Sequence, residues 1–180
     1  GPFFSPDGAR LTFFSDRSGR YHIWWAPIEE GRRVGEAEQL TFEDTTDYLP
    51  RISPDGSTLA WLGNREDEEN VWIRSLVGPA EPRTLTEGRR IRSFWWEPGS
   101  RSLLVTGDWE DEGLSLRRVS AVNGLSTSVD LPIDFGREDT GGTDFSTGKV
   151  SFSVDGRYSV HAQVEMKGDL WIMEAEPRDP

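Results

Sequence analysis

The stretch SPDGSTLAWLG at residues 53–63 decides the fold that this sequence predicts. Its first four residues form a tight-turn pattern, because proline presets φ at the first central position and glycine accepts the positive φ that other residues resist. The residues after the turn include leucine, alanine and tryptophan, as expected of a strand that packs in a sheet. The stretch therefore predicts a turn that leads into a β-strand.

The turn recurs along the chain, as SPDG at residues 5–8, EPGS at 97–100 and SVDG at 153–156. The third residues of the four turns are 48, 44 and 56 positions apart, and an apolar strand, a charged turn and a second strand follow each one. Repeats of about 40–50 residues with four short strands are typical of β-propeller blades. We assign structural, turn-forming roles to Pro6, Asp7, Gly8, Pro54, Asp55, Gly56, Asp155 and Gly156.

The predicted fold is all-β, because nowhere do apolar residues keep a helical period over the length of a helix. We expect a single β-propeller domain or propeller fragment at residues 3–176, with about four four-stranded blades and no outer strand in the last one. The blades cover roughly residues 3–42, 48–86, 92–132 and 144–176. Three arrangements stay open: a fragment of a longer propeller, a closed four-bladed disc, or half of a larger ring that a second copy completes as a homo-oligomer.

These motifs together resemble the WD-like repeat of TolB-type propellers. The resemblance rests on the Ser-Pro-Asp-Gly turn, the Leu-x-Phe strand at 11–13, the Asp-Arg-x-Gly turn at 16–19, the Ile-Trp strand at 23–24 and the Leu-Thr ends at 40–41 and 85–86. The same repeat builds the propeller domains of tricorn-type and prolyl-oligopeptidase-type proteases. The resemblance implies a propeller fold and favours a periplasmic or secreted location, with a cytoplasmic one left open.

The composition excludes several classes of function. With 32 acidic and 20 basic residues among 180, the chain has a net charge of -12, whereas nucleic-acid binding requires a basic surface. The absence of cysteine removes disulfides, thiolate metal sites and cysteine nucleophiles. No apolar run reaches the roughly 18–20 residues of a membrane helix, so we expect no membrane insertion.

No catalytic constellation is evident in the sequence, and we predict that the chain is not an enzyme. The Gly-x-Ser-x-Gly elbow of serine hydrolases does not occur. The two histidines, His22 and His161, fall on predicted strands, where a ring nitrogen most often bonds a backbone carbonyl. The many paired carboxylates cluster in turns, where ordinary solvation explains them.

No cofactor is predicted, although calcium stays open because acidic turns supply the oxygen ligands that it prefers. The turn at residues 108–113 has the charge for calcium but not the spacing of an EF-hand loop. We expect no specific metal site there.

The tryptophans divide by whether they recur. Trp24, Trp72 and Trp171 occupy one place in the repeat, and we predict that they form the core between adjacent blades. Trp109 is not repeated and lies within an acidic turn, so we expect it to be an exposed contact residue.

The acidic side chains concentrate in the loops of one face. In a propeller, the loops between the second and third strands of each blade and the loops between blades emerge on the same side, and here these loops carry nearly all of the net charge. Such a face attracts cationic partners, although acidic loops also serve solubility alone. The candidate binding residues are Asp44, Asp47, Glu66, Glu68, Asp108, Trp109, Glu110 and Asp111.

The predicted function is that of a non-catalytic propeller scaffold, which binds a protein or peptide, cationic in character, through this acidic loop face. Two alternatives stay open. One is a substrate-gating propeller domain of a tricorn-like or prolyl-oligopeptidase-like protease. The other is a propeller that binds a small ligand or a metal in its central channel.

Overall fold

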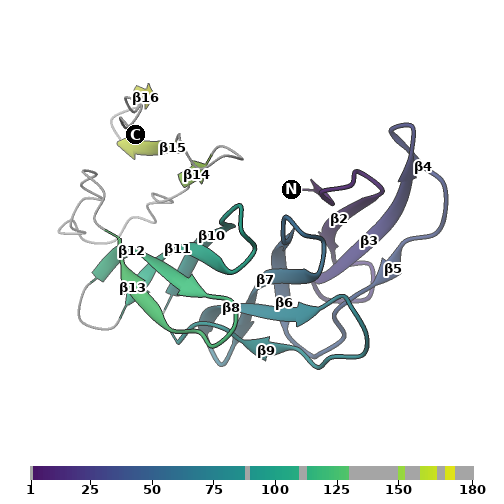
Figure 1. Cartoon of the computed structure of the whole chain (residues 1–180), viewed down its shortest axis with the longest axis horizontal. Coiled ribbons are helices and arrows are strands. Elements are labelled where there is room, and N and C mark those ends of the chain that lie inside the picture. The colour runs from purple at the N-terminus through teal and green to yellow at the C-terminus, as the bar shows by residue number, and fades with distance from the viewer. Residues whose placement is uncertain are drawn as a thin grey trace. The chain divides into compact units, whose positions relative to one another are not determined.

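The structure is a computed structural model, and it describes residues 2–87, 90–109, 113–129, 150–152, 159–165 and 169–172. Side chains are described as far as residue 129, except those of residues 113 and 114. The chain divides into two compact units, Gly1–Gly88 and Arg89–Pro180 (Figure 1). Of the predicted residues, Glu110, Asp111, Asp155, Gly156 and the side chains of His161 and Trp171 lie outside this description.

The first unit contains two antiparallel sheets, each built from consecutive strands of the chain. In blade 1, β2 pairs with β1 and β3, and β3 pairs with β5 and, through a hairpin at its far end, with β4. In blade 2, the strands pair in the order β6, β7, β8, β9. The bounds are β1 Phe3–Phe4, β2 Arg10–Ser15, β3 His22–Glu29, β4 Arg32–Arg33, β5 Glu38–Gln39, β6 Thr46–Ile52, β7 Thr58–Arg65, β8 Glu68–Ser75 and β9 Arg83–Thr84.

The second unit repeats this arrangement. Blade 3 is an antiparallel sheet of β10 to β13, and the strands that the structure describes in blade 4 are β14 to β16. The bounds are β10 Arg90–Trp96, β11 Ser102–Trp109, β12 Gly113–Ser120, β13 Ser126–Ser128, β14 Val150–Phe152, β15 Ser159–Glu165 and β16 Asp169–Ile172. No helix occurs among the residues that the structure describes, so the all-β prediction is confirmed.

The repeated turns close in the way that their sequence predicts. Gly8 and Gly56 have φ values of +70° and +75°, which L side chains rarely adopt. In blade 2, the Ser53 hydroxyl donates to Asp55 Oδ1 at 2.6 Å, and the same oxygen accepts the Ser57 backbone N–H at 3.0 Å. These contacts all lie within a few residues of one another, which is why the turn can be recognised in the sequence.

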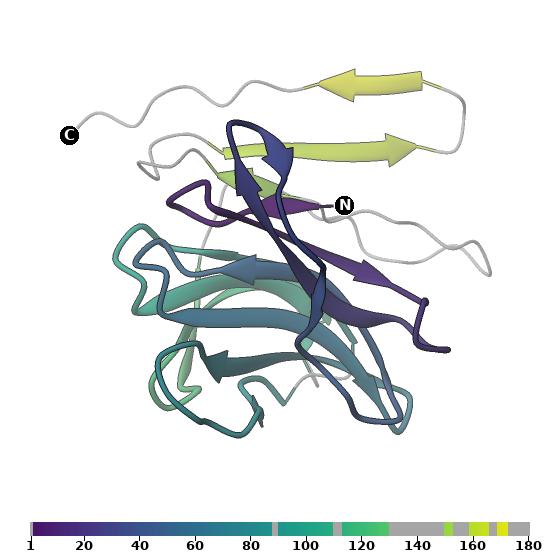
Figure 2. The same ribbon diagram turned by 90° about the vertical axis from the view of Figure 1, so that its right-hand side faces the viewer.

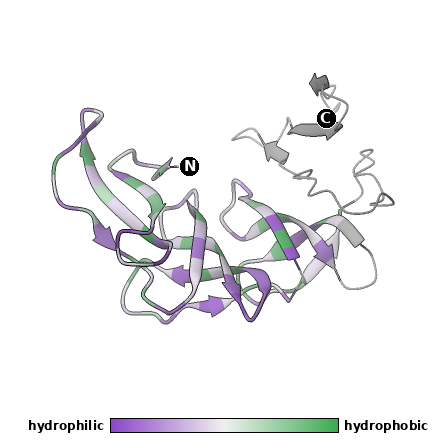
Figure 3. Cartoon of the chain, turned by 180° about the vertical axis from the view of Figure 1, so that it is seen from behind, coloured by the Kyte–Doolittle hydropathy of each residue, from purple (hydrophilic) through white to green (hydrophobic). Residues whose placement is uncertain are grey.

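The core of the first unit lies between blades 1 and 2, whose sheets run beside each other in Figure 2. Bands of apolar and polar residues alternate along their strands in Figure 3, as expected of sheets that bury one face. The buried side chains at its centre come from both blades. They are Ile23, Leu40, Leu59 and Trp61.

The two recurrent tryptophans of this unit differ in their packing. Trp72 is half-buried and packs against the core cluster, as expected of the core between blades. Trp24 is also half-buried but is not among the residues that pack against this cluster, and the Arg17 guanidinium lies 4.9 Å from its ring centroid. The deepest tryptophan is Trp61, which is fully buried and does not recur in the repeat.

Candidate functional site

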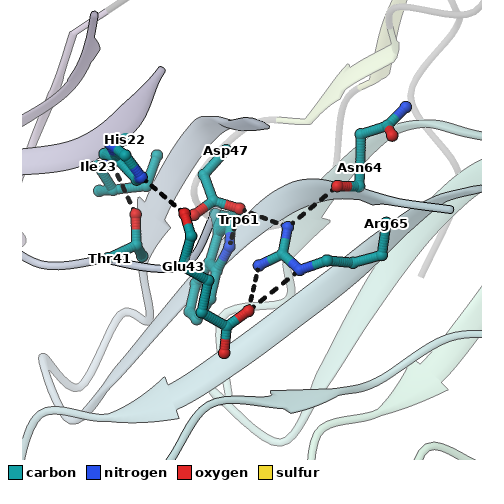
Figure 4. A network of polar contacts seen from close by, with 8 residues as sticks. All are labelled: His22, Ile23, Thr41, Glu43, Asp47, Trp61, Asn64 and Arg65. Atoms are coloured by element: carbon teal, nitrogen blue, oxygen red, sulfur yellow. Dashed lines mark hydrogen bonds and ion pairs between the residues drawn. The ribbon is translucent and has the colours of Figure 1, made fainter. Parts of the chain in front are cut away.

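Three segments of the first unit meet at one edge of its sheets, where the predicted loop face lies. Asp47 N donates to Tyr21 O at 2.8 Å, and His22 Nε2 lies 2.9 Å from Glu43 O. Arg65, at the end of β7, reaches the same place (Figure 4). We call this the loop edge, formed by residues 16–22, 42–47 and 64–68.

Asp47 is fully buried beneath the loop edge, which corrects the prediction of an exposed binding residue. Its Oδ1 accepts hydrogen bonds from Trp61 Nε1 and Arg65 Nη1, both at 3.0 Å (Figure 4). A Cβ at position 63 would lie 3.0 Å from the same oxygen, so Gly63 leaves room for this contact. Asp47 therefore holds two strands together. The sequence alone does not distinguish Asp47 from an exposed loop carboxylate, because its partners are 14 and 18 residues away.

Arg65 joins the buried and exposed parts of the loop edge. It contacts Glu43 Oε2 through Nε at 3.2 Å and through Nη2 at 3.1 Å, in addition to Asp47. Its guanidinium also lies 4.5 Å from the ring centroid of Trp72. The side chain is only 18% exposed, so its guanidinium is largely shielded from solvent and is paired with Glu43 and Asp47.

The other two arginines of the loop edge are also engaged. Arg20 forms an ion pair of 2.5 Å with Asp44, whose side chain is exposed as predicted. Arg17 lies 5.1 Å from the ring centroid of Phe13, over the aromatic surface that also includes Trp24, and its Nε donates to Ser15.

Three carboxylates at the tip of one hairpin project from the loop edge, with no ion-pair or hydrogen-bond partner among the described residues. Glu66 and Asp67 form the tip of the hairpin between β7 and β8, with φ values of +53° and +66°, as in type I′ turns. Both are exposed, as is the adjacent Glu68. Among the described residues, none of these three carboxylates forms an ion pair or hydrogen bond. The predicted exposure of Glu66 and Glu68 agrees with this placement.

His22 has a structural role, because both ring nitrogens are occupied. Nε2 donates to the carbonyl of Glu43, which leaves Nδ1 to accept the Ser18 hydroxyl at 2.8 Å. The bond to a backbone carbonyl is the one expected from the sequence. His22 is 6% exposed and is therefore poorly placed to act as a catalytic base.

The Leu-Thr ends of the first two repeats have a role that the sequence did not disclose. Thr41 Oγ1 accepts the backbone N–H of Ile23 at 3.0 Å, and Thr86 Oγ1 accepts that of Val71 at 2.9 Å. Each threonine thus satisfies a buried N–H of the third strand of its blade. The recurrence of Leu-Thr was the signal for this role.

In the second unit, Trp109 is 5% exposed, which corrects the prediction of an exposed contact residue. Its Nε1 donates to Ser115 O at 3.3 Å, and Arg117 lies 4.8 Å from its ring centroid. The hairpin of β11 and β12 brings these partners to the ring, although the acidic sequence around it suggests a solvated turn. Asp108 is partly buried and lies 3.5 Å from Arg92 Nη2.

The described residues contain no group of three histidine, aspartate or glutamate side chains that could hold a metal ion. The turn in which calcium was considered, residues 108–113, lies partly outside the description. Within that same description, no helix is long and apolar enough to cross a membrane.

Comparisons with known proteins agree with this architecture. No protein-family model matches the chain. It is 30% identical over 112 residues to a protein TolB homolog of Chlorobaculum tepidum, covering 62% of this chain and 25% of the relative. It is 32% identical over 113 residues to the uncharacterized peptidase YuxL of Bacillus subtilis, covering 58% of this chain and 16% of the relative.

Among solved structures, TolB from Acinetobacter baumannii superposes with a TM-score of 0.71 at 16% identity, covering 96% of this chain and 39% of that one. The chain thus has the fold of a β-propeller, built from repeated antiparallel blades. The resemblance to TolB-type propellers that was inferred from the Ser-Pro-Asp-Gly turns is confirmed. The chain spans a quarter or less of the length of these two curated relatives.

Proposed function

We propose that this propeller segment is a non-catalytic binding module that recognises a cationic protein or peptide segment through its loop edge. One observation carries the proposal. Arg20 and Arg65 form ion pairs and Arg17 lies over aromatic rings, whereas the carboxylates of the hairpin tip have no partner in the part of the chain that the structure describes. These carboxylates are Glu66, Asp67 and Glu68.

This arrangement leaves a local excess of negative charge at the loop edge of a chain whose net charge is already -12. A field of this sign raises the association rate of a cationic partner by roughly 10- to 1000-fold at low ionic strength. It repels nucleic acid and anionic membrane surfaces. A basic segment of a protein is therefore the partner that the charge favours.

A non-catalytic role is supported by the state of His22, whose two ring nitrogens are both occupied. The TolB-like repeat supports a role in protein binding and a periplasmic location. Both are proposals for this chain.

A second candidate function is that of a propeller domain that gates substrate entry in a peptidase. The observation that favours it is the 32% identity with YuxL, which is named a peptidase and of which the chain spans 16%. In that case the loop edge would meet peptides on their way to a separate catalytic domain. A gene product that continues into a Gly-x-Ser-x-Gly elbow would favour this candidate.

The experiment for the loop edge compares two charge-neutralised variants of the full chain. The loop-edge variant is Glu66→Gln, Asp67→Asn, Glu68→Gln. The control is Glu29→Gln, Glu30→Gln, Glu36→Gln, which removes three exposed carboxylates from the other set of loops. Binding is measured against an array of dodecapeptides that range from acidic to basic.

We expect wild type to bind basic peptides, the loop-edge variant to bind them several-fold more slowly at low salt, and the control to resemble wild type. If both variants lost peptide binding equally, the effect would come from the net charge of the chain and not from the loop edge. No preference for basic peptides in wild type would overturn the proposal.

A further inference from the structure

A groove of about 480 Å³ lies between blades 1 and 2, next to the loop edge. One wall is the outer part of blade 1, with Trp25 and Phe42. The other wall is the end of β8 and the loop that follows it, residues 74–76 and 78–82. We call this the interblade groove.

We propose that the interblade groove binds an extended segment of a partner protein in which an apolar residue stands next to a basic one. The inference rests on the proposed function and deepens it. The loop edge attracts a cationic segment, and the groove holds its apolar part.

The apolar half of this recognition rests on side chains that the fold leaves uncovered. Phe42 lines the groove and is 70% exposed, although it directly follows the buried Leu40-Thr41 pair. Trp25 and Leu76 also line the groove, and both are only partly buried. Large apolar side chains that gather on a concave surface are typical of interaction sites.

The wall beyond β8 is preformed. Gly78 has a φ of +78°, and Pro79 and Pro82 fix their own backbone torsions. A wall of this kind loses little conformational entropy when a ligand binds.

The polar part of the recognition follows from the orientation of the charged side chains that line the groove. The two arginines that line the groove are turned inward: Arg74 Nη1 donates to Leu40 O at 2.8 Å, and Arg65 binds Glu43 and Asp47. The carboxylates are on the outside instead. Those that line the groove are the exposed Glu38, Glu43 and Glu81.

These carboxylates keep capacity for a cation. Glu38 Oε2 accepts Trp25 Nε1 at 2.8 Å, which leaves the other oxygen of that group available. Among the described residues, Glu81 forms no hydrogen bond or ion pair. A lysine or arginine of the partner therefore meets negative charge at the rim of an apolar groove.

An extended occupant suits the backbone of this site. The short outer strand β9 pairs with β8 at Trp72 and Ile73, and the groove is lined by the two strand residues beyond that point, Arg74 and Ser75. This part of the sheet edge is not covered by β9. Segments that lie along sheet edges bind in extended form, with alternate side chains in pockets.

The test uses the same dodecapeptide array on the full chain, with apolar, basic and acidic residues varied independently. Two variants address the groove, Phe42→Ala and Glu81→Lys. The matched control is Leu125→Ala, because Leu125 is 71% exposed and is not among the residues that line the groove. Thermal unfolding of each variant is recorded to exclude loss of fold.

We expect the best wild-type ligands to combine apolar and basic residues. Phe42→Ala should weaken them by about tenfold, as for an aromatic contact at the centre of an interface. Glu81→Lys should weaken the binding of basic peptides selectively, and Leu125→Ala should leave binding unchanged.

Each other outcome has a distinct meaning. Basic peptides that still bind Phe42→Ala fully but lose affinity for the loop-edge variant would overturn the groove and leave the proposed function standing. If Phe42→Ala lost peptide binding and the loop-edge variant did not, the result would support binding in the groove and overturn the role proposed for the loop edge. Equal binding of acidic and basic apolar peptides would overturn the proposed occupant.

Discussion

Ser100 adopts the left-handed backbone conformation, with a φ of +58°, that Gly56 adopts with a φ of +75° in the equivalent turn of the preceding blade. Gly56 N donates to Ser53 O at 2.8 Å, and Ser100 N donates to Glu97 O at 3.0 Å, so the backbone turn is the same. In blade 3 the motif carries serine where the other turns carry glycine. The geometry of the turn is thus kept at the cost of an unfavourable torsion.

The first prediction concerns these torsions. Ser100→Gly should raise the free energy of unfolding by about 0.5–1 kcal/mol, and Gly56→Ala should lower it by about 1 kcal/mol, because L residues resist the left-handed region. Urea denaturation measures both changes. Gly99→Ala is the control, since Gly99 lacks a left-handed φ and a Cβ there would meet nothing within 4 Å. If Gly56→Ala were as harmless as this control, the argument from φ would fail.

The second prediction separates two aspartates that the sequence placed on one surface. Asp47→Ala should destabilise the chain by about 3 kcal/mol, because it removes a buried carboxylate from Trp61 and Arg65. Asp44→Ala should change stability by less than about 0.5 kcal/mol, because its side chain is 85% exposed. Tryptophan fluorescence during denaturation reports both. Similar effects of the two substitutions would contradict the buried network.

The third prediction concerns pH. The Ser53 hydroxyl and then the Ser57 backbone N–H hold the pKa of Asp55 below its ordinary value of 3.8, and Ser5 and Ala9 do the same for the pKa of Asp7. A carboxyl with a lowered pKa in the folded state contributes stability above its unfolded pKa and loses it as pH falls through the folded one. Asp55→Asn should therefore be less stable than wild type near neutral pH, and the difference should shrink below about pH 4. Denaturation at a series of pH values tests this, and a difference that stayed constant would refute it.

The fourth prediction concerns assembly. Phe4, in the first strand of blade 1, is 63% exposed, and an apolar side chain on a short inner strand suits contact with another blade. We expect the isolated chain to scatter light with twice the mass of one copy, as for a ring shared by two copies. A monodisperse monomer with cooperative unfolding would exclude the shared ring.

The fold was predictable because its signals are local. Ser53, Asp55 and Gly56 contact one another within the turn, so their spacing alone indicates the structure. The recurrence of that turn then gives the blades. The strand that follows each turn could be located in the same way.

The candidate site was harder to predict, because burial depends on partners distant in the sequence. Asp47 and Trp109 lie in acidic stretches that suggest solvent, yet Trp61 and Arg65 cover the first, and Ser115 and Arg117 contact the second. Exposed loop residues, such as Glu66 at the tip of a hairpin, could be placed correctly from their neighbours.

The interblade groove could not be predicted from the sequence at all. Its two walls are joined by the contact of Arg74 with Leu40 O, which are 34 residues apart. Phe42 reads as an ordinary loop residue until the loop after β8 is placed opposite it.

The outer strands of the blades have a consequence for solution behaviour. β5 and β9 have only two residues each, β13 has three, and β5 and β9 carry the exposed charged residues Glu38 and Arg83. A sheet edge that is short and charged is a poor template for a strand from another molecule, whereas a long apolar edge seeds fibrils. The short, charged outer strands thus protect the blades from edge-to-edge aggregation at high protein concentration.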